Sequence, residues 1–322
     1  MRSCVIGGAG FIGKHLTEAL IESGRDVLVL GRKTDPSAEF AQLLQTQTSH
    51  LTYQSLDVSD MSSLRPLLAS CDEVIDLAYS TVPQTSFSDP MFDLQSNLPR
   101  VVALMEELKH HTKLRRFMVV SSGGTVYGHA TQLPISEYAQ TEPVSPYGIT
   151  KLTIERYALM YHRLHDLPVV LVRPANAYGL GQQAFKGQGF IATAIGSILQ
   201  GKTITVYGEQ GTVRDYVHVR DVASAMLAAI EHGTNGHVYN IGSGVGRSNL
   251  EVLDLIRPIA QADGFSLNVH HEEERKFDVA ANVLNFGRLL NCSGWLPRIG
   301  MEDGLTEMWR GMSSQSLAAI KN

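Results

Sequence analysis

The feature that most constrains this chain is a glycine-rich turn close to its start. An apolar run over residues 4–6 reads as a short buried strand, and an amphipathic pattern covers residues 11–23. Between them, and in the first helical turn, Gly7, Gly10 and Gly13 recur at every third position. Such glycines form the tight turn, let backbone N–H groups approach a pyrophosphate, and let the helix pack closely on the strand. A glycine trio alone is weak evidence, but its place between strand and helix predicts a dinucleotide site.

The segments that follow predict the fold class. Apolar runs alternate with stretches of helical period through the first half of the chain. The expected strands are residues 26–30, 51–56, 73–77, 117–120 and 169–172, and the expected helices are 61–69, 92–109 and 146–164. This alternation implies right-handed crossovers and a doubly wound parallel α/β sheet. The continuous apolar strands suit a sheet that is covered on both faces.

The composition changes after residue 176. Residues 179–189 are rich in glycine and glutamine and predict a loop that leaves the sheet. Short elements follow, with helices expected at 190–200, 220–232 and 248–261 and strands at 203–207 and 237–241. We therefore expect a dinucleotide-binding domain over 1–176, with 215–241 returning to it. A smaller α+β substrate domain is expected over 177–214 and 242–322.

Bulk composition excludes several classes of protein. Hydrophobic residues make up 43% and charged residues 18%, as in ordinary globular proteins. With a net charge of −5, the chain has no excess of basic residues that would indicate binding to nucleic acid or to an anionic membrane. The chain enters a strand at once and has no long apolar run, so neither a signal peptide nor a membrane span is expected. Cys4, Cys71 and Cys292 lack paired spacing and are expected to be reduced and mostly buried, which favours the cytoplasm.

The segment Ser145 to Lys151 carries the second strong signal. Tyr147 and Lys151 are four residues apart on an expected helix and therefore share one face. A nearby ammonium group favours the phenolate form of a tyrosine, which makes Tyr147 a candidate general acid or base. An isolated pair with this spacing is more often an ordinary surface feature. Together with the glycine turn, it predicts a catalytic pair beside a dinucleotide.

These features resemble those of the extended short-chain dehydrogenases/reductases, in the nucleotide-sugar epimerase/dehydratase branch. The resemblance runs through nearly the whole chain, and its motifs are specific for the family rather than for one substrate. Besides the glycine turn and the Tyr147/Lys151 pair, its marks are the segments 121–128 (SSGGTVYG), 173–176 (RPAN), 211–221 (GTVRDYVHVRD) and 239–244 (YNIGSG). The resemblance implies a Rossmann-type first domain.

The resemblance also implies roles for individual residues. Tyr147 would take a proton from a sugar hydroxyl while hydride moves from the same carbon to nicotinamide, and Lys151 would lower the pKa of Tyr147 and bind the ribose. The residues expected around the cofactor are Gly7, Gly10, Phe11, Ile12, Gly13, Arg32, Asp57, Val58, Leu77, Ala78, Tyr79, Asn97 and Lys151. Among them, Asp57 and Val58 would lie at the adenine, and Asn97 would support the site.

The substrate side follows from the same resemblance. Asn176, Arg214 and Arg275 match family positions that hold the diphosphate of a nucleotide sugar. A guanidinium fork suits phosphate oxygens, although Arg275 stands beside three glutamates and a surface ion pair is the alternative there. Relatives form dimers through the helices that correspond to 97–109 and 147–164, so we expect a homodimer.

One departure from the family concerns the catalytic hydroxyl. The family places a Ser or Thr three residues before the Val-Tyr-Gly sequence, where this chain has Gly123. Ser122 or Thr125 can supply the hydroxyl instead, with a slight preference for Thr125 as a partner of the substrate oxygen. Family dehydratases and decarboxylases carry acidic residues here, whereas this chain has Gly124 and Thr125.

Without those acidic residues, dehydration and decarboxylation are not expected, and epimerisation and keto-reduction remain as candidate reactions. We expect an epimerase that acts at C4 of a UDP-hexose or of its N-acetyl form. A nucleotide-sugar ketoreductase that consumes NADPH is the alternative within enzymes. A non-catalytic dinucleotide-binding regulator is the alternative outside them, and the Tyr147/Lys151 pair argues against it.

The other departure concerns the cofactor. NAD-binding members usually have an acidic residue at the end of the second strand, where it accepts both ribose hydroxyls. This chain has Gly31, Arg32 and Lys33 there. The residues favour NADP while the resemblance favours NAD, so the sequence leaves both open.

The histidines do not predict a metal site. The pairs His110/His111, His162/His165 and His270/His271 lack carboxylate or cysteine partners at ligand spacing. Positions 162 and 165 lie near an expected helix C-terminus, which favours imidazolium. The three glutamates at 272–274 are expected to face solvent. We therefore expect no metal.

Overall fold

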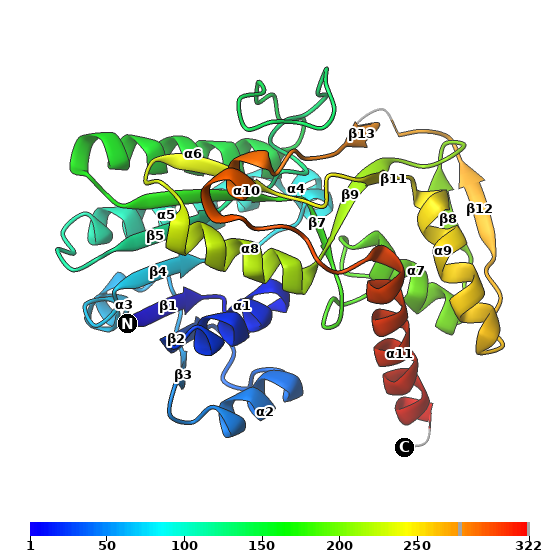
Figure 1. Ribbon diagram of the computed structural model, residues 1–322, viewed down its shortest axis with the longest axis horizontal. Coiled ribbons are helices and arrows are strands. Elements are labelled where there is room, and N and C mark those ends of the chain that lie inside the picture. Colours follow the sequence, from blue (N-terminus) through cyan, green and yellow to red (C-terminus); the bar gives the residue numbers. More distant parts are fainter. Residues whose placement is uncertain (276–278, 321–322) are drawn as a thin grey trace.

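The computed structural model describes residues 1–275 and 279–320. A seven-stranded parallel sheet forms its centre, in the order β10-β6-β5-β4-β1-β2-β3 (Figure 1). Its strands are β1 (Arg2–Ile6), β2 (Asp26–Gly31), β3 (Leu51–Ser55), β4 (Glu73–Asp76), β5 (Arg116–Val120), β6 (Val169–Pro174) and β10 (His237–Ile241). The predicted doubly wound α/β fold is confirmed.

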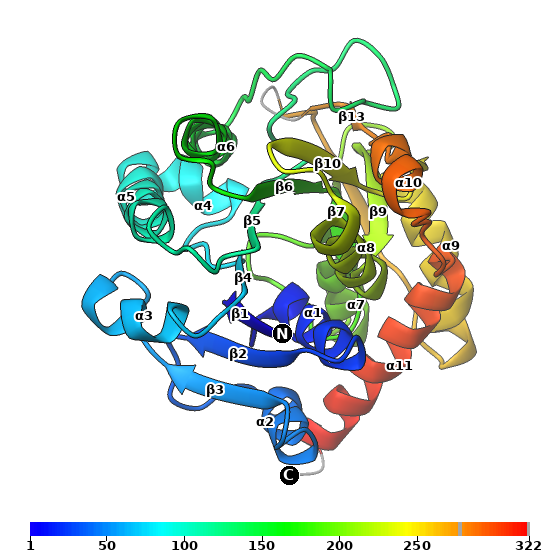
Figure 2. The same ribbon diagram turned by 60° about the vertical axis from the view of Figure 1, so that its left-hand side comes forward.

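Helices cover both faces of this sheet, as Figure 2 shows. One face carries α3 (Met61–Leu68), α5 (Pro90–Leu108) and α6 (Pro146–His165); the other carries α1 (Phe11–Glu22), α2 (Ala38–Thr46), α8 (Val219–His232) and α10 (Gly287–Ser293). Successive strand residues point to opposite faces, so Cys4 and Ile6 enter one hydrophobic cluster and Val5 enters the other. This double burial explains why β1 is apolar without alternation.

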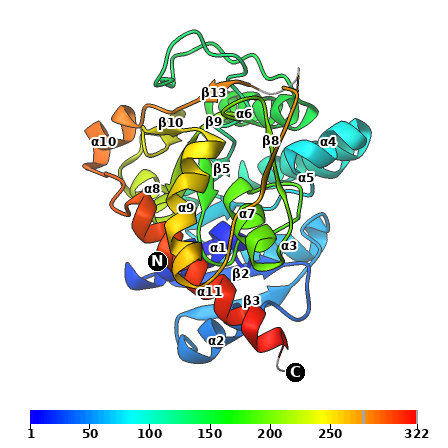
Figure 3. The same cartoon turned by 90° about the vertical axis from the view of Figure 1, so that its right-hand side faces the viewer.

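A second group of elements packs beside the sheet domain (Figure 3). Its helices are α7 (Phe190–Leu199), α9 (Asn249–Ala262) and α11 (Met301–Ile320), and β8 (Ile204–Tyr207) pairs in parallel with β12 (Val269–Glu272). Their apolar side chains form a separate core around Ile195, Leu253 and Trp309. Between the two domains, β9 (Val213–His218) pairs with β7 (Asn176–Tyr178), β11 (Gly246–Arg247) and β13 (Ala281–Asn282). A short helix, α4 (Pro83–Ser88), precedes α5.

Several elements were not predicted. Helix α2 follows the loop after β2 and starts with Ser37, whose hydroxyl accepts the Phe40 N–H. Helix α11 lies in the part of the chain with weak periodicity. It is held by Leu305, Met308 and Trp309, which pack into the second core. Helix α10 packs on α8 and β10, so part of the segment predicted for the substrate domain lies against the sheet domain.

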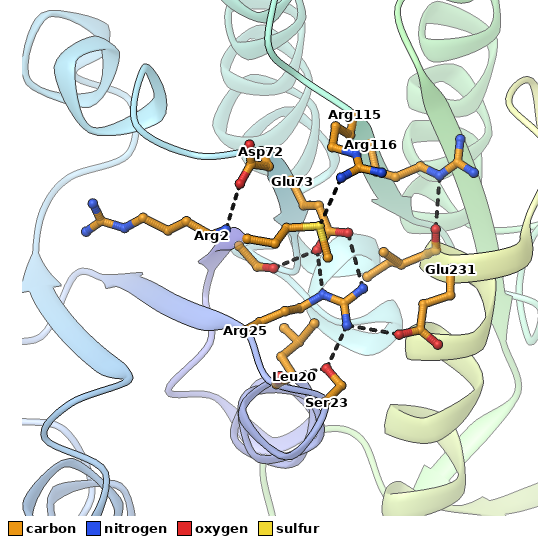
Figure 4. A network of polar contacts seen from close by, with 12 residues as sticks. Arg2, Leu20, Ser23, Arg25, Asp72, Glu73, Arg115, Arg116 and Glu231 are labelled. Atoms are coloured by element: carbon orange, nitrogen blue, oxygen red, sulfur yellow. Dashed lines mark hydrogen bonds and ion pairs between the residues drawn. The ribbon is translucent and has the colours of Figure 1, made fainter.

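A buried ion network closes the amino ends of the strands (Figure 4). Arg25 donates to Glu73 at 2.9 Å and to Glu231 at 2.9 Å, and it also reaches the hydroxyl of Ser23. Ser3 of β1 donates a further hydrogen bond to Glu73 at 2.6 Å. All three guanidinium nitrogens of Arg25 have acceptors, so this buried cation is fully paired.

Candidate active site

The candidate site lies at the opposite, carboxyl edge of the sheet. Strand β1 pairs with β2 on one side and with β4 on the other, so the chain reverses its winding direction at β1. Ligands of open α/β sheets bind in the crevice outside such a switch point. The segments that follow β1, β2, β3, β4, β5 and β6 carry most of the residues predicted for the site.

The glycine turn has the geometry of a pyrophosphate cradle. Gly7 adopts a φ of +82°, and a Cβ atom on Gly13 would lie 2.5 Å from the Gly7 carbonyl oxygen. Gly10 is the N-cap of α1 and contributes no side-chain cap, so the N-terminus of the helix at Phe11 and Ile12 is left for another acceptor. A helix N-terminus with free N–H groups suits an anion. The turn therefore fits a dinucleotide.

The loop after β4 forms a second wall. A Cβ atom on Gly7 would lie 3.1 Å from the backbone nitrogen of Ala78, so Leu77, Ala78 and Tyr79 pass directly beside the glycine turn. Arg100 fixes this loop by donating to the Ala78 carbonyl at 2.7 Å and pairing with Asp76. Asn97 is only 1% exposed and accepts the Ser80 N–H at 2.9 Å. This contact holds the loop in place, and the role of Asn97 at a cofactor stays a prediction.

Tyr147, Lys151 and Tyr79 meet in the middle of the crevice. Tyr147 lies in the first turn of α6, which begins at the N-cap Ser145. The rings of Tyr79 and Tyr147 meet edge to face, with centroids 4.9 Å apart. The Lys151 Nζ atom lies 4.0 Å from the Tyr79 ring centroid and 5.6 Å from that of Tyr147. Tyr79 therefore packs against both members of the predicted catalytic pair and holds the ammonium against its ring face.

The electrostatics of this group differ from the simple expectation. Burial raises the pKa of Tyr147, the nearby Asp93 raises it further, and a hydrogen bond with Ser122 lowers it. Burial also lowers the pKa of Lys151 to about 8. Lys151 donates to the Val120 carbonyl at 2.9 Å. That Lys151 lowers the pKa of Tyr147 and binds the ribose remains a prediction.

The turn after β5 explains the missing hydroxyl. A Cβ atom on Gly123 would lie 2.4 Å from a methyl carbon of Leu284 and 2.9 Å from the Arg173 carbonyl oxygen, so no side chain fits. Ser122 reaches Tyr147, whereas the Thr125 hydroxyl is enclosed and has no hydrogen-bond partner within the described residues. The contact favours Ser122 as the partner of Tyr147, and Thr125 keeps a hydroxyl for a ligand.

The three residues predicted for the substrate lie on three different segments. The side-chain oxygen of Asn176 is 3.3 Å from a Cβ atom on Gly124, which places Asn176 beside the catalytic turn. Arg214 lies on β9 and donates to the Val213 carbonyl. Arg275 stacks over the ring of Tyr207 at 4.0 Å, at the end of β8. This cation–π contact holds the guanidinium beside the end of β8.

The residues predicted for the adenosine end follow β2 and β3. Asp57 accepts the backbone N–H and the hydroxyl of Ser59, which lowers the pKa of its carboxyl group. The side chain of Val58 is buried in the core. Arg32 is exposed immediately after β2.

One residue of the site was not predicted. Asp93 is fully buried in α5, where its carboxylate accepts the Thr81 hydroxyl and its carbonyl accepts the Asn97 side chain at 2.7 Å. Its charge raises the pKa values of Tyr79 and Tyr147. The spacing of Asp93 and Asn97 on one helix face is the only sequence signal for it, and that spacing is common.

Metal sites and membrane spans were also sought. Within residues 1–275 and 279–320, no three His, Cys, Asp or Glu side chains gather as metal ligands would. No helix in the described part of the chain has the length and apolar character needed to cross a membrane.

Comparisons with known proteins define the class. The family model described as "NAD dependent epimerase/dehydratase family" matches residues 3–242. A UDP-glucose 4-epimerase of Mycolicibacterium smegmatis is 31% identical, over 95% of this chain and 97% of that protein. The crystal structure of a UDP-glucose 4-epimerase from Thermotoga maritima with UDP-glucose has a TM-score of 0.88 at 29% identity, covering 98% of this chain and 99% of that one. A UDP-glucuronic acid 4-epimerase from Bacillus cereus, in complex with UDP-glucuronic acid and NAD, gives 0.87 at 26%, covering 98% and 100%.

The fold and the crevice thus define a nicotinamide-dinucleotide enzyme of the extended short-chain type. The chain belongs to the NAD dependent epimerase/dehydratase family. The predictions of a nucleotide-sugar epimerase and of a nicotinamide cofactor are confirmed at this level.

Proposed function

We propose that the protein interconverts two nucleotide sugars that differ at C4 of the hexose, with a UDP-hexose or its N-acetyl form as substrate. The observation that carries the proposal is the Tyr147 hydroxyl beside Ser122, at the crevice lined by the glycine turn. The names of the relatives, which act at C4 of UDP sugars, support uridine diphosphate as the carrier.

Each residue of the site has its own proposed role in the proton and hydride transfers. A dinucleotide bound along Gly7, Gly10 and Gly13 would supply a ring that accepts a hydride and returns it. Tyr147 removes the proton from the C4 hydroxyl and returns it to the same oxygen when the keto group is reduced on either of its faces. Ser122 holds the tyrosine oxygen and favours its ionised form, because its hydrogen bond lowers the pKa of Tyr147. The ammonium of Lys151 supplies a positive charge beside the phenol.

Three side chains are proposed to hold the substrate's carrier. Asn176 lies nearest the catalytic turn, and Arg214 and Arg275 follow along β9 and the segment after β12. Guanidinium groups pair well with phosphate oxygens, so the two arginines suit the diphosphate. With the diphosphate held at a distance from the reacting carbon, the hexose can rotate and present its other face.

The test is a panel of UDP-, GDP-, CDP- and dTDP-hexoses and N-acetylhexosamines, followed by NMR for new sugar isomers. We expect a C4 epimer from a UDP sugar, without added dinucleotide and without its net consumption. A ketoreductase would consume added NADPH in proportion to product. Binding of dinucleotide with no conversion of any sugar would instead support a regulator.

We also propose a homodimer formed through α5 and α6. These helices expose large apolar side chains, among them Phe92, Ile149, Met160 and Leu164. Light scattering should give twice the chain mass for the wild type and one chain mass for Met160→Glu/Leu164→Glu. The cytoplasm is the proposed location, and the three cysteines are free, as expected where thiols stay reduced.

A further inference from the structure

We propose that Asp93 is a positioning residue of the reaction. Its buried carboxylate fixes Tyr79, and the ring of Tyr79 in turn holds the ammonium of Lys151 beside the phenol of Tyr147. The inference rests on the proposed function and deepens it, because it names a residue that acts on the Tyr147/Lys151 pair through another side chain.

Helix α5 fastens the segment that follows Tyr79. Asn97 accepts the backbone N–H of Ser80 at 2.9 Å, and the carboxylate of Asp93 accepts the hydroxyl of Thr81. Positions 93 and 97 are four residues apart and therefore share one face of the helix. Both side chains are buried, at 0% and 1% exposure, so water does not compete for these contacts. The backbone that carries the Tyr79 ring is thus held against α5.

The ring of Tyr79 connects this carboxylate with the Tyr147/Lys151 pair. Burial raises the pKa of Tyr79, and the charge of Asp93 together with its hydrogen bond to Tyr79 raises that pKa further. Tyr79 therefore stays a neutral phenol. The Lys151 ammonium lies over the face of this ring, 4.0 Å from the centroid, as a cation does on a neutral aromatic ring. The Tyr147 ring meets it edge to face, with centroids 4.9 Å apart.

Asp93 is also the carboxylate of this group that no cation neutralises. The charged side chains that face Lys151 are Asp76 of β4, Asp93 and Arg100 of α5, and Glu155 of its own helix α6. Asp76 pairs with Arg100 at 3.0 Å, and Glu155 pairs with Arg173 at 2.6 Å. Asp93 forms no ion pair within residues 1–275 and 279–320. For Tyr147, Asp93 is the charged group that adds to the effect of burial.

The carboxylate acts on both members of the pair in the same direction. A negative charge favours the ammonium of Lys151 and disfavours the phenolate of Tyr147, so it raises both pKa values. Asp93 thereby opposes the burial that lowers the pKa of Lys151 to about 8. An amide of the same shape at position 93 should lower both pKa values. A residue that only supports the fold would move neither.

The first experiment measures the pKa of Lys151 in the full-length protein. Lysine labelled with ¹³C at Cε is followed by NMR through a pH titration, and Lys151→Met identifies the signal of Lys151. We expect a wild-type midpoint at about pH 8. In Asp93→Asn the midpoint should be about one pH unit lower, because a nearby negative charge is removed. An unchanged midpoint overturns the inference, whether or not any sugar is converted.

A matched control lies one turn earlier on the same helix. Asp89 is the exposed N-cap of α5, where its carboxylate accepts the Phe92 N–H at 2.9 Å. Asparagine caps a helix as well as aspartate does, so Asp89→Asn removes a carboxylate without loosening the helix. The Lys151 midpoint should be the same in Asp89→Asn as in the wild type. An equal shift in both variants would show that net charge, and not the place of Asp93, sets it.

Turnover of the UDP sugar connects these shifts with the reaction. In Asp93→Asn the rise of turnover with pH should move to lower pH by about one unit, because the phenolate of Tyr147 forms more readily. Tyr79→Phe keeps the ring but removes the hydroxyl that reaches Asp93, so turnover should fall by about 3- to 10-fold with the Lys151 midpoint unchanged.

The outcomes separate the inference from the proposed function. A pH profile that Asp93→Asn leaves in place overturns the role of Asp93 in the reaction. If Asp93→Asn does not fold, full turnover of Tyr79→Phe overturns the proposed link between the two side chains. A wild type that converts no sugar overturns the proposed function, and the ¹³C titration still decides whether Asp93 acts on Lys151.

Discussion

The two edges of the central sheet differ in whether their buried polar groups have hydrogen-bond partners. At the amino edge, Arg25 and Glu73 are each about 3% exposed and satisfy one another with Ser3, Ser23 and Glu231 (Figure 4). At the carboxyl edge, the hydroxyls of Ser121 and Thr125 are enclosed but have no hydrogen-bond partner in the described part of the chain. The same sheet therefore has one paired edge and one edge with polar groups left for a ligand.

We expect the amino edge to contribute to the stability of the fold and the carboxyl edge to contribute to activity. A buried ion pair whose donors are all matched is costly to break, because either partner left alone is a buried charge. An enclosed hydroxyl without a partner costs free energy that a bound ligand can recover. Substitutions at the amino edge should therefore change the free energy of unfolding, and substitutions at the carboxyl edge should change activity.

The largest effect is expected for Tyr147→Phe. The substitution removes the acid/base oxygen and keeps the ring that packs on Tyr79, so epimerisation should fall by about 10³-fold with the unfolding midpoint preserved. NMR of sugar isomers and thermal unfolding measure the two quantities. Tyr157→Phe, at an exposed tyrosine of the same helix, is the matched control and should keep full activity. Equal activity of the two variants would remove Tyr147 from the chemistry.

Next in size is Arg25→Met. It leaves Glu73 charged and buried without its partner, so the free energy of unfolding should fall by about 3–5 kcal/mol. Urea denaturation measures the loss, and the folded fraction should retain its turnover number. Arg65→Met is the control: this exposed arginine pairs with Glu107 on the surface, and its loss should cost no more than about 1 kcal/mol. A loss of turnover without a loss of stability in Arg25→Met would contradict the division between the edges.

A pH-dependent effect is expected at Lys151. Burial lowers its pKa from the ordinary value of 10.5 to about 8, so between these pH values the unfolded chain binds the proton and the folded chain does not. Stability contributed by this group therefore rises with pH over that window. We expect the unfolding free energy of the wild type, relative to Lys151→Met, to increase by about 3 kcal/mol from pH 8 to 10.5. A constant difference across the window would show that burial does not shift this lysine.

The smallest effect distinguishes the two hydroxyls beside Gly123. Ser122→Ala removes the hydrogen bond that lowers the pKa of Tyr147, so turnover should fall by roughly tenfold and the rise of rate with pH should move to higher pH. Thr125→Val removes a hydroxyl that has no partner in the described residues, and should affect the Michaelis constant more than turnover. The sequence slightly favours Thr125 for the catalytic contact. The reverse pattern of effects would support that preference over the structure.

Much of the first domain followed from local patterns. The glycine turn, the unbroken apolar strands and the Tyr147/Lys151 spacing are short-range features, and they were enough to predict the parallel sheet and the helix that carries Tyr147. The family marks extended this to named substrate positions. Helix α11 was missed because its anchor residues meet their partners only across the second core.

Tertiary structure alone decided which residues contact one another in the crevice. Gly123 lacks a side chain because Leu284, 161 positions later, fills the space beside it, and Gly31 lacks one because Tyr53 on the neighbouring strand does. Tyr79 and Asp93 come close to the Tyr147/Lys151 pair only when the loop after β4 packs against α5. Sequence patterns report the periodicity of one segment at a time. The steric and electrostatic effects that select these residues act between segments that the fold brings together.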